Sequence, residues 1–228
     1  MQAPRSKEIV WFFDLDDTLH HATPHIFPHM NRAMTQYVMQ HLALDEAAAN
    51  QLRERYWRRY GATLLGLMRH HATDPRHFLA ETHRFPDLTS MVLREAQLRA
   101  ALRQLPGEKV LFSNAPRAYV LAVLLVLGIR DLFSAIYSIE SLRYRPKPSI
   151  QAMQRIFARH PARVQIMVED NLPNLRTARR CGLATVWMRP TEQSAFKPTL
   201  RTYRGRPGYV DATVESVHQL LAVSSTLI

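Results

Sequence analysis

Three carboxylates stand directly behind a short apolar run near the start of the chain. Residues 9–13 are apolar, and Asp14, Asp16 and Asp17 follow them closely. If the run is a buried strand, residues i and i+2 share a face, so Asp14 and Asp16 point to one spot while Asp17 points elsewhere. Two convergent carboxylates repel each other unless a cation lies between them or one stays protonated. The spacing therefore predicts a site for a hard divalent cation, although acid clusters also occur in solvated loops.

Further polar groups follow apolar segments later in the chain and turn this acid pair into a candidate site. They are Ser113 and Asn114 behind residues 109–112, Lys147 in a proline-flanked loop, and Glu169 with Asp170 behind residues 164–168. In an open parallel sheet, ligands bind just beyond the carboxyl ends of the strands. Groups that are far apart in the sequence can meet there, and these would form a site of acids with one cation.

The chemistry that these residue types suit is phosphoryl transfer to a carboxylate. Asp14 could attack phosphorus in line and form an aspartyl-phosphate, while Asp16 could protonate the leaving alkoxide and later deprotonate water. Ser113 Oγ and nearby backbone N–H groups would bind phosphoryl oxygens, and Lys147 would balance their charge. Mg²⁺ usually keeps several waters, so two carboxylates and a backbone carbonyl are enough protein ligands for it. The simpler alternatives are a solvated loop lysine and a Ser-Asn helix cap.

The segments that must position these groups alternate between strand and helix patterns. We predict strands at residues 9–13, 109–112, 133–139, 164–168, 184–188 and 209–211, with helices between the later ones, a long polar loop at 191–208 and a last helix at 214–221. Repeated βα units of this kind require a mostly parallel sheet that is covered on both faces. The fold class is therefore α/β.

A helical insertion separates the first strand from the others. Residues 31–104 carry apolar residues at three-to-four spacing and no strand-like alternation, which predicts an all-α segment. Residues 20–29 precede it as a hinge whose prolines exclude a regular helix before Met30. Within the insertion, arginines surround three aromatic residues, Tyr56, Trp57 and Tyr60. Such a set could hold a phosphorylated base by charge and stacking, but a dense arginine run is more often a solvated helix face.

Composition narrows the class of protein. The chain has 228 residues, of which 46% are hydrophobic and 21% charged, as in ordinary globular proteins. No apolar run approaches the ~20 residues of a membrane span, and no signal peptide is recognisable. The single cysteine, Cys181, cannot form an internal disulfide and fits a reducing compartment. These features predict a cytoplasmic protein without a membrane partner.

The net charge of +11 raises the possibility of a nucleic-acid partner. Four of the 30 basic residues are lysines, and the arginines are scattered along the whole chain rather than gathered in one stripe. A generally basic, solvated surface explains this pattern better than a nucleic-acid interface.

The candidate residues resemble the four motifs of the haloacid dehalogenase-like (HAD) hydrolase superfamily in order and spacing. The matching stretches are residues 14–18, Ser113-Asn114, Lys147-Pro148 and Glu169-Asp170. The resemblance implies a Rossmann-like core formed by residues 1–24 and 105–228, with an α-helical cap at 25–104. It also implies Mg²⁺ held by Asp14, the Asp16 carbonyl and Asp170. We expect Thr18, Ser113, Asn114 and Lys147 to bind phosphate. An acid at position 16 resembles the phosphatases and disfavours dehalogenation.

Within the superfamily the chain is similar to the pyrimidine 5′-nucleotidase-like branch. The similarity lies in residues 60–67 of the cap, 112–115 and 169–175. One departure is Asn174, where many superfamily members carry a second acid that faces the metal. We expect an amide oxygen or water to take that place, and we expect Glu169 to act from behind the metal ligands.

These observations predict an Mg²⁺-dependent phosphomonoesterase that works through an aspartyl-phosphate, with a pyrimidine 5′-nucleotide as its substrate. The first alternative is a phosphatase of a sugar phosphate or of phosphoglycolate. The second is a nucleic-acid-binding protein on an inactive core, which the intact set of catalytic residue types disfavours. We expect a monomer or a homodimer acting on a small phosphorylated metabolite.

Overall fold

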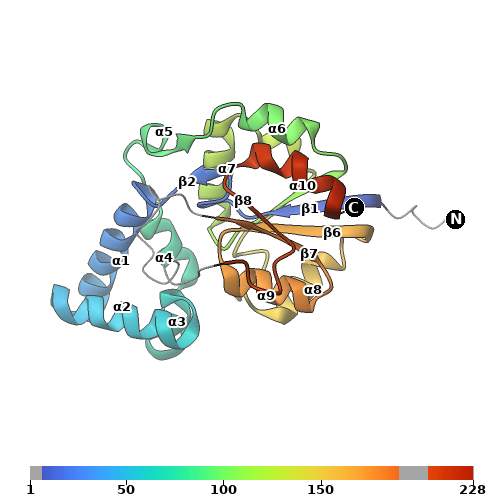
Figure 1. Ribbon diagram of the computed structural model, residues 1–228. Coiled ribbons are helices and arrows are strands. Elements are labelled where there is room, and N and C mark those ends of the chain that lie inside the picture. The colour runs from blue at the N-terminus through green and yellow to red at the C-terminus, as the bar shows by residue number, and fades with distance from the viewer. Residues whose placement is uncertain (1–6, 190–204, 228) are drawn as a thin grey trace, which may run out of the picture.

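The computed structural model describes residues 7–189 and 205–227, and it has an α/β fold (Figure 1). Six parallel strands form one sheet in the order β5-β4-β1-β6-β7-β8. They are β1 (Lys7–Phe13), β4 (Glu108–Phe112), β5 (Ala135–Tyr137), β6 (Ala162–Glu169), β7 (Ala184–Met188) and β8 (Ala212–Val214). The predicted parallel, Rossmann-like sheet is therefore confirmed.

Strand β1 lies in the middle of the sheet, and its residues 10–13 are completely buried. Its side chains alternate between two hydrophobic clusters, with Trp11 and Phe13 on one face and Val10 and Phe12 on the other. Because β4 and β6 pair with it on either side, the sheet edge beyond Phe13 collects the carboxyl ends of three strands. This is the edge at which the predicted site should form.

Helices cover both faces of the sheet, as Figure 1 shows. One face carries α6 (Leu98–Gln104), α7 (Arg117–Leu127) and α10 (Leu220–Leu227), and the other carries α8 (Ile150–Phe157) and α9 (Leu172–Arg180). The apolar sides of these helices complete the two clusters on which the sheet rests. Among the described residues, no helix has both the length and the apolar character needed to cross a membrane.

A group of helices lies beside the core, beyond the carboxyl ends of the strands (Figure 1). They are α1 (Ile26–Leu42), α2 (Glu46–Tyr60), α3 (Thr63–His71) and α4 (Pro75–Thr82), and we call them the cap. Helix α1 begins at Ile26, earlier than the prolines suggested, because Pro28 falls in the first turn, where no backbone N–H is needed for a helical hydrogen bond.

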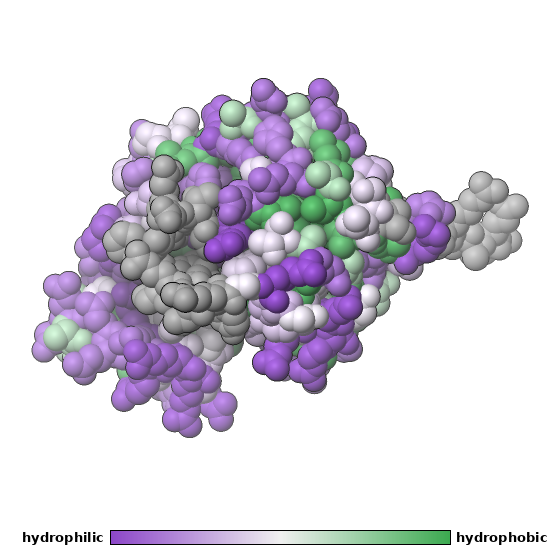
Figure 2. Space-filling model, viewed as in Figure 1, coloured by the Kyte–Doolittle hydropathy of each residue, from purple (hydrophilic) through white to green (hydrophobic). Residues whose placement is uncertain are grey.

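The cap surface is mostly hydrophilic, as the lower left of Figure 2 shows. Helices α2 and α3 contribute exposed Arg55, Arg58, Arg59 and Arg69 to the surface. Arg58 pairs with Glu54 one helical turn away. These arginines occupy the solvated helix face that the sequence pattern offered as the simpler alternative.

Two short segments rejoin the cap to the core. Strand β2 (His20–His21) pairs with β3 (Leu93–Arg94), although we predicted no strand in this region. The four-residue helix α5 (Leu88–Met91) comes just before β3, and α6 follows it and packs in the same cluster as Trp11. The division into a core of 1–24 and 105–228 and a cap of 25–104 stays a prediction, with α6 lying on the core side.

The end of the chain differs from the prediction. The last strand is β8 rather than 209–211, because Val210 N–H closes a turn onto Pro207 and the Asp211 carboxylate accepts a hydrogen bond from Thr185 N–H. A short 3₁₀ turn and α10 then replace the helix predicted at 214–221. Most of the loop predicted at 191–208 lies outside the described residues.

Candidate active site

A cavity of about 310 Å³ opens at the carboxyl edge of the sheet, between the core and the cap. The predicted site residues that line it are Asp14, Asp16, Ser113, Asn114, Lys147, Glu169 and Asp170. They come from the ends of β1, β4 and β6 and from the loop between β5 and α8. Groups separated by more than 150 residues are thus brought into one cavity by parallel strand pairing, as the sequence predicted.

Lys147 is the centre of the polar network. Its Nζ donates to Asp14 Oδ1, to Glu169 Oε2 and to the Phe112 carbonyl, each at 2.7 Å. Only 3% of Lys147 is exposed, so its charge is taken almost fully out of water. Such a burial is tolerable because two carboxylates surround the ammonium group. The alternative of a solvated loop lysine is thereby excluded.

The electrostatics of the site reflect crowded acids. Burial raises the pKa of Asp14 to about 6, although Lys147 acts in the opposite direction and Asp170 and Asp16 add to the rise. Burial and the neighbouring Asp14 raise the pKa of Glu169 well above its ordinary value. The two carboxylates in turn raise the pKa of Lys147 against the effect of its own burial. The lysine is therefore a fixed cation, and the raised pKa values of the two acids show that their charged forms lack a further cation.

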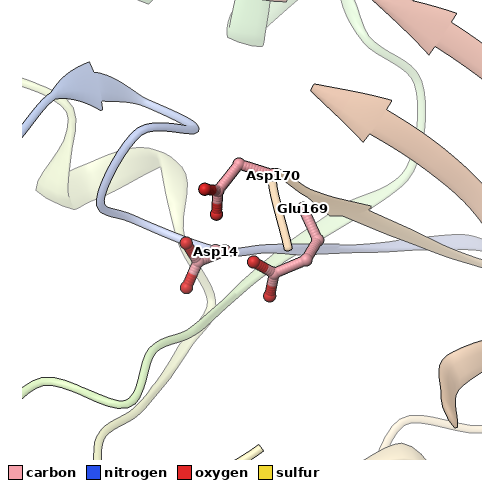
Figure 3. Close-up of side chains that lie close together, drawn as sticks. All are labelled: Asp14, Glu169 and Asp170. Atoms are coloured by element: carbon pink, nitrogen blue, oxygen red, sulfur yellow. The ribbon is translucent and has the colours of Figure 1, made fainter. Parts of the chain in front are cut away.

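The residues present fit a metal ion. Carboxylate oxygens of Asp14, Glu169 and Asp170 lie within 4.8 Å of one another, and all three side chains are buried. Figure 3 shows their carboxylates gathered at the ends of β1 and β6. A bound cation would stabilise the charged forms of these three neighbouring acids, and an all-oxygen donor set suits a hard divalent cation. The arrangement can bind a metal ion.

Ser113 and Asn114 follow β4, and their side chains make different contacts. Ser113 is 1% exposed, and its Oγ accepts a hydrogen bond from Ala115 N–H, which leaves the hydroxyl hydrogen for an anion in the cavity. Asn114 exchanges two hydrogen bonds with the Lys147 backbone, at 2.8 and 3.1 Å. Its side chain therefore fixes the lysine loop, a role that the sequence did not indicate.

Asp16 is held by two side chains that sequence reasoning did not single out. Tyr119 Oη donates to Asp16 Oδ1 at 2.6 Å, and His20 Nε2 lies 2.9 Å from the same oxygen. Burial alone would raise the pKa of Asp16, but the hydrogen bonds from His20 and Tyr119 outweigh it and the pKa is lowered. His20 lies four residues after Asp16, so proximity was a usable signal, whereas nothing local points to Tyr119.

The other two residues of the first motif organise the loop. Asp17 adopts a positive φ of 60° and accepts hydrogen bonds from Ala22 N–H, Thr23 N–H and the Thr23 hydroxyl. It turns away from the cavity, as strand alternation predicted. Thr18 is buried but does not line the cavity, and its hydroxyl has no hydrogen-bond partner among the described residues. The predicted contact of Thr18 with phosphate therefore gains no support from this geometry.

Asn174 contacts Glu169, one of these three acids, and lines the cavity with it. The Asn174 amide Nδ2 donates to Glu169 Oε2 at 3.0 Å, the oxygen that also receives Lys147. Because an amide nitrogen points at Glu169, the role of Asn174 is to orient that carboxylate rather than to add another acid.

The cap closes the cavity with an apolar wall. Residues 61–65, which join α2 to α3, lie on it, so the stretch that resembles the nucleotidase-like branch forms part of the cavity. Trp57 lines the same cavity although 56% of it is exposed, which places it at the mouth. The remaining cap side chains on this wall are Phe27, Met30, Met34, Phe78 and Leu79, and His83 lines the cavity just after α4.

Comparison with known proteins agrees with this geometry. "Phosphate metabolism protein 8" of Saccharomyces cerevisiae is 24% identical over 196 residues, which cover 78% of this chain, and the chain spans about 60% of that relative's length. A haloacid dehalogenase-like hydrolase from Burkholderia xenovorans has a similar structure, with a TM-score of 0.61 and 21% identity over 96% of this chain and 98% of that one.

A HAD phosphatase from Thermococcus onnurineus also has a TM-score of 0.61, with 16% identity over 95% of this chain and 97% of that one. At such identities the structural likeness shows a shared fold. The family is shown by the sequence itself, since residues 10–182 match the haloacid dehalogenase-like hydrolase family over more than half of the chain. With the four motif residue sets gathered in one cavity, the chain belongs to the haloacid dehalogenase-like hydrolases.

Proposed function

We propose that this protein is an Mg²⁺-dependent phosphomonoesterase that works through an aspartyl-phosphate on Asp14 and acts on a pyrimidine 5′-nucleotide. The observation that carries the proposal is the buried Lys147, whose Nζ lies 2.7 Å from both Asp14 and Glu169 in a cavity that Ser113 also lines. A cation fixed beside a buried carboxylate and a free hydroxyl donor is what a transferring phosphoryl group requires.

In the first step, Asp14 attacks the phosphorus atom. Its described hydrogen bond is made through Oδ1, so Oδ2 is the oxygen available to form the new P–O bond. The bond from phosphorus to the leaving oxygen breaks, and that oxygen takes a proton from Asp16. The Ser113 hydroxyl and the Lys147 ammonium group stabilise the charge on the phosphoryl oxygens.

In the second step, water replaces Asp14 on phosphorus. Asp16, now a carboxylate, takes a proton from the water, the new P–O bond forms, and the bond between Asp14 and phosphorus breaks to release phosphate. The lowered pKa of Asp16 suits this role as a base, while the negative charge of a bound phosphate ester favours its protonated form beforehand. Mg²⁺ bound by Asp14 and Asp170 would neutralise the phosphoryl oxygens.

The cap wall supports a substrate with a flat, uncharged leaving group. Lys147 is the only lysine or arginine among the described residues that line the cavity. Its ammonium group already pairs with Asp14 and Glu169. The carboxylate of phosphoglycolate would find no lysine or arginine among the described residues of this wall, and Thr63 and His83 are the polar side chains that it offers to a sugar. A nucleoside presents a planar base to Trp57 and the apolar side chains. The choice of a pyrimidine rests on the motif resemblance.

A panel of phosphate esters tests this proposal. We expect faster phosphate release from uridine and cytidine 5′-monophosphates than from glucose 6-phosphate or phosphoglycolate, measured as kcat/KM. Equal or better release from the sugar phosphates would contradict the nucleotide assignment and favour the first alternative. Salt-sensitive nucleic-acid binding without any phosphate release would favour an inactive core instead.

Removal of the metal gives a second prediction. Excess chelator should lower phosphate release to under about a tenth of its value, and added Mg²⁺ should restore it, because the three buried acids repel the phosphate dianion without a cation. Full activity in chelator would remove the metal from the mechanism.

The proposal also places the enzyme in the cytoplasm, where its single cysteine stays reduced.

Trp57 gives a third prediction. We expect Trp57→Ala to raise the KM for uridine 5′-monophosphate by about 5- to 30-fold, the equivalent of ~1–2 kcal/mol of lost base stacking, with kcat changed less than about 3-fold. Arg58→Ala is the control, since its side chain lies next in sequence but pairs with Glu54. Equal KM values for the two variants would show that Trp57 does not contact the base.

A further inference from the structure

The Asp16 carboxylate is anchored through one of its two oxygens. Both of its described hydrogen bonds, from Tyr119 Oη at 2.6 Å and from His20 Nε2 at 2.9 Å, reach Oδ1. Tyr119 and His20 are each 3% exposed, whereas the Asp16 side chain keeps 16% of its surface exposed and lines the cavity. The second oxygen, Oδ2, is therefore the one left for groups in the cavity.

We propose that Tyr119 and His20 are positioning residues that hold Asp16 so that Oδ2 delivers its proton to the leaving oxygen of the substrate. The inference rests on the proposed phosphatase activity. The terminal torsion of an aspartate is broad, so an unanchored carboxylate would turn freely between useful and useless orientations. Two donors on one oxygen remove that freedom before the substrate binds, which is the contribution of preorganisation to a proton transfer.

The two donors are themselves held by neighbouring segments of the chain. Tyr119 lies on α7, and its ring packs against Phe85 and His83, with ring centroids 5.3 and 5.7 Å apart. His83 and Phe85 directly follow cap helix α4, so the cap holds the phenol that holds Asp16. His20 pairs with Arg94 through β2 and β3, which fixes its backbone beside the segment that returns from the cap.

The chemistry of the proton transfer gives the inference its test. As the bond between phosphorus and the leaving oxygen breaks, the O–H bond at Asp16 Oδ2 breaks and its proton joins the leaving oxygen. A strongly basic leaving group depends on this proton, whereas p-nitrophenolate is stable without it. Phenyl phosphate and p-nitrophenyl phosphate are similar in shape and differ mainly in the basicity of the leaving oxygen. They therefore separate loss of proton delivery from loss of binding.

We expect Tyr119→Phe to lower kcat/KM for phenyl phosphate by about 10- to 100-fold and for p-nitrophenyl phosphate by less than about 3-fold. Tyr137→Phe is the matched control, because its hydroxyl bonds to His160 rather than to a site residue, and it should lower neither value. His20→Gln retains an N–H donor and should keep more activity on phenyl phosphate than His20→Leu does. Melting temperatures of all variants establish that they are folded.

Two results would overturn the inference. An equal loss on both esters would mean that Tyr119 supports the fold or binding rather than proton delivery, and an unchanged phenyl phosphate rate would mean that Oδ1 needs no anchor. Both results require a wild-type protein that hydrolyses the two esters, so they leave the proposed function standing. A wild-type protein without phosphatase activity would instead refute the proposed function and this inference with it.

Discussion

Asp14→Asn should reduce phosphate release by on the order of 1,000-fold or more, because the amide oxygen cannot replace a carboxylate as the nucleophile at phosphorus. The carboxylate is 7% exposed and receives Lys147 at 2.7 Å, so the site is built around its charge. The measurement is kcat with saturating substrate and Mg²⁺, on protein whose melting temperature shows that it is folded.

Asp17→Asn is the matched control for this variant. Asp17 lies three residues away and carries the same functional group, but its oxygens bind Ala22 N–H, Thr23 N–H and the Thr23 hydroxyl. An asparagine retains an acceptor for the backbone, so at least roughly a tenth of the activity should remain. A comparable loss of activity in both variants would mean that any change of charge in this loop inactivates the enzyme and that Asp14 has no separate role.

Lys147→Met should both inactivate the enzyme and destabilise it. Removing the ammonium group leaves Asp14 and Glu169 buried without their shared cation, and breaking a buried ion pair in this way costs about 3–5 kcal/mol of unfolding free energy. Denaturant unfolding at neutral pH measures the loss. Added Mg²⁺ should return part of the stability, because a bound cation again neutralises the carboxylates.

Lys109→Met separates these two effects. Lys109 is also buried, but its Nζ donates to the carbonyls of Leu105 and Gly107 and contacts no site acid. This variant should lose stability while each folded molecule keeps its turnover, and Mg²⁺ should not restore it. If Lys147→Met kept its turnover like Lys109→Met, Lys147 would be a structural lysine only.

The convergence of the motif residues could be predicted because it depends on simple geometry. Parallel strands end at one edge of a sheet, so Asp14, Ser113 and Asp170 had to approach one another once β1, β4 and β6 were recognised. The prediction that Asp16 faces the site and Asp17 does not came from the two-residue period of a strand, although β1 ends at Phe13 and Asp17 turns away through a positive φ of 60°. These features can be recognised in short stretches of the sequence, where an apolar run ends at a polar residue.

The surroundings of Asp16 could not be predicted in the same way. Tyr119 reaches Asp16 across 103 positions in the sequence, from a helix whose apolar pattern gives no reason to expect a buried phenol aimed at an acid. The side-chain pairing of Asn114 with the Lys147 loop is equally non-local. Such contacts depend on how loops and the cap pack, which spacing along the chain does not determine.

The errors at the element ends have a similar origin. Pro28 was expected to delay α1, but a proline in the first turn leaves no hydrogen bond unmade. The last strand was predicted three residues too early. The Asp211 carboxylate accepts the hydrogen bond from Thr185 N–H that a backbone carbonyl of the predicted strand was expected to accept. Both element ends depend on which backbone groups form hydrogen bonds, and the pattern of apolar residues does not determine this.

The most direct test of the central claim is to find the phosphoryl group on the protein. The Asp16→Asn variant should still accept a phosphoryl group from p-nitrophenyl phosphate, because this leaving group needs no proton. It should hydrolyse the aspartyl-phosphate slowly, because no carboxylate at position 16 takes the proton from water. We predict a burst of about one p-nitrophenolate per enzyme, with the phosphoryl group mapped to Asp14 after acid quenching and peptide mass spectrometry. A phosphoryl group on another residue, or an undiminished burst in Asp14→Asn/Asp16→Asn, would contradict it.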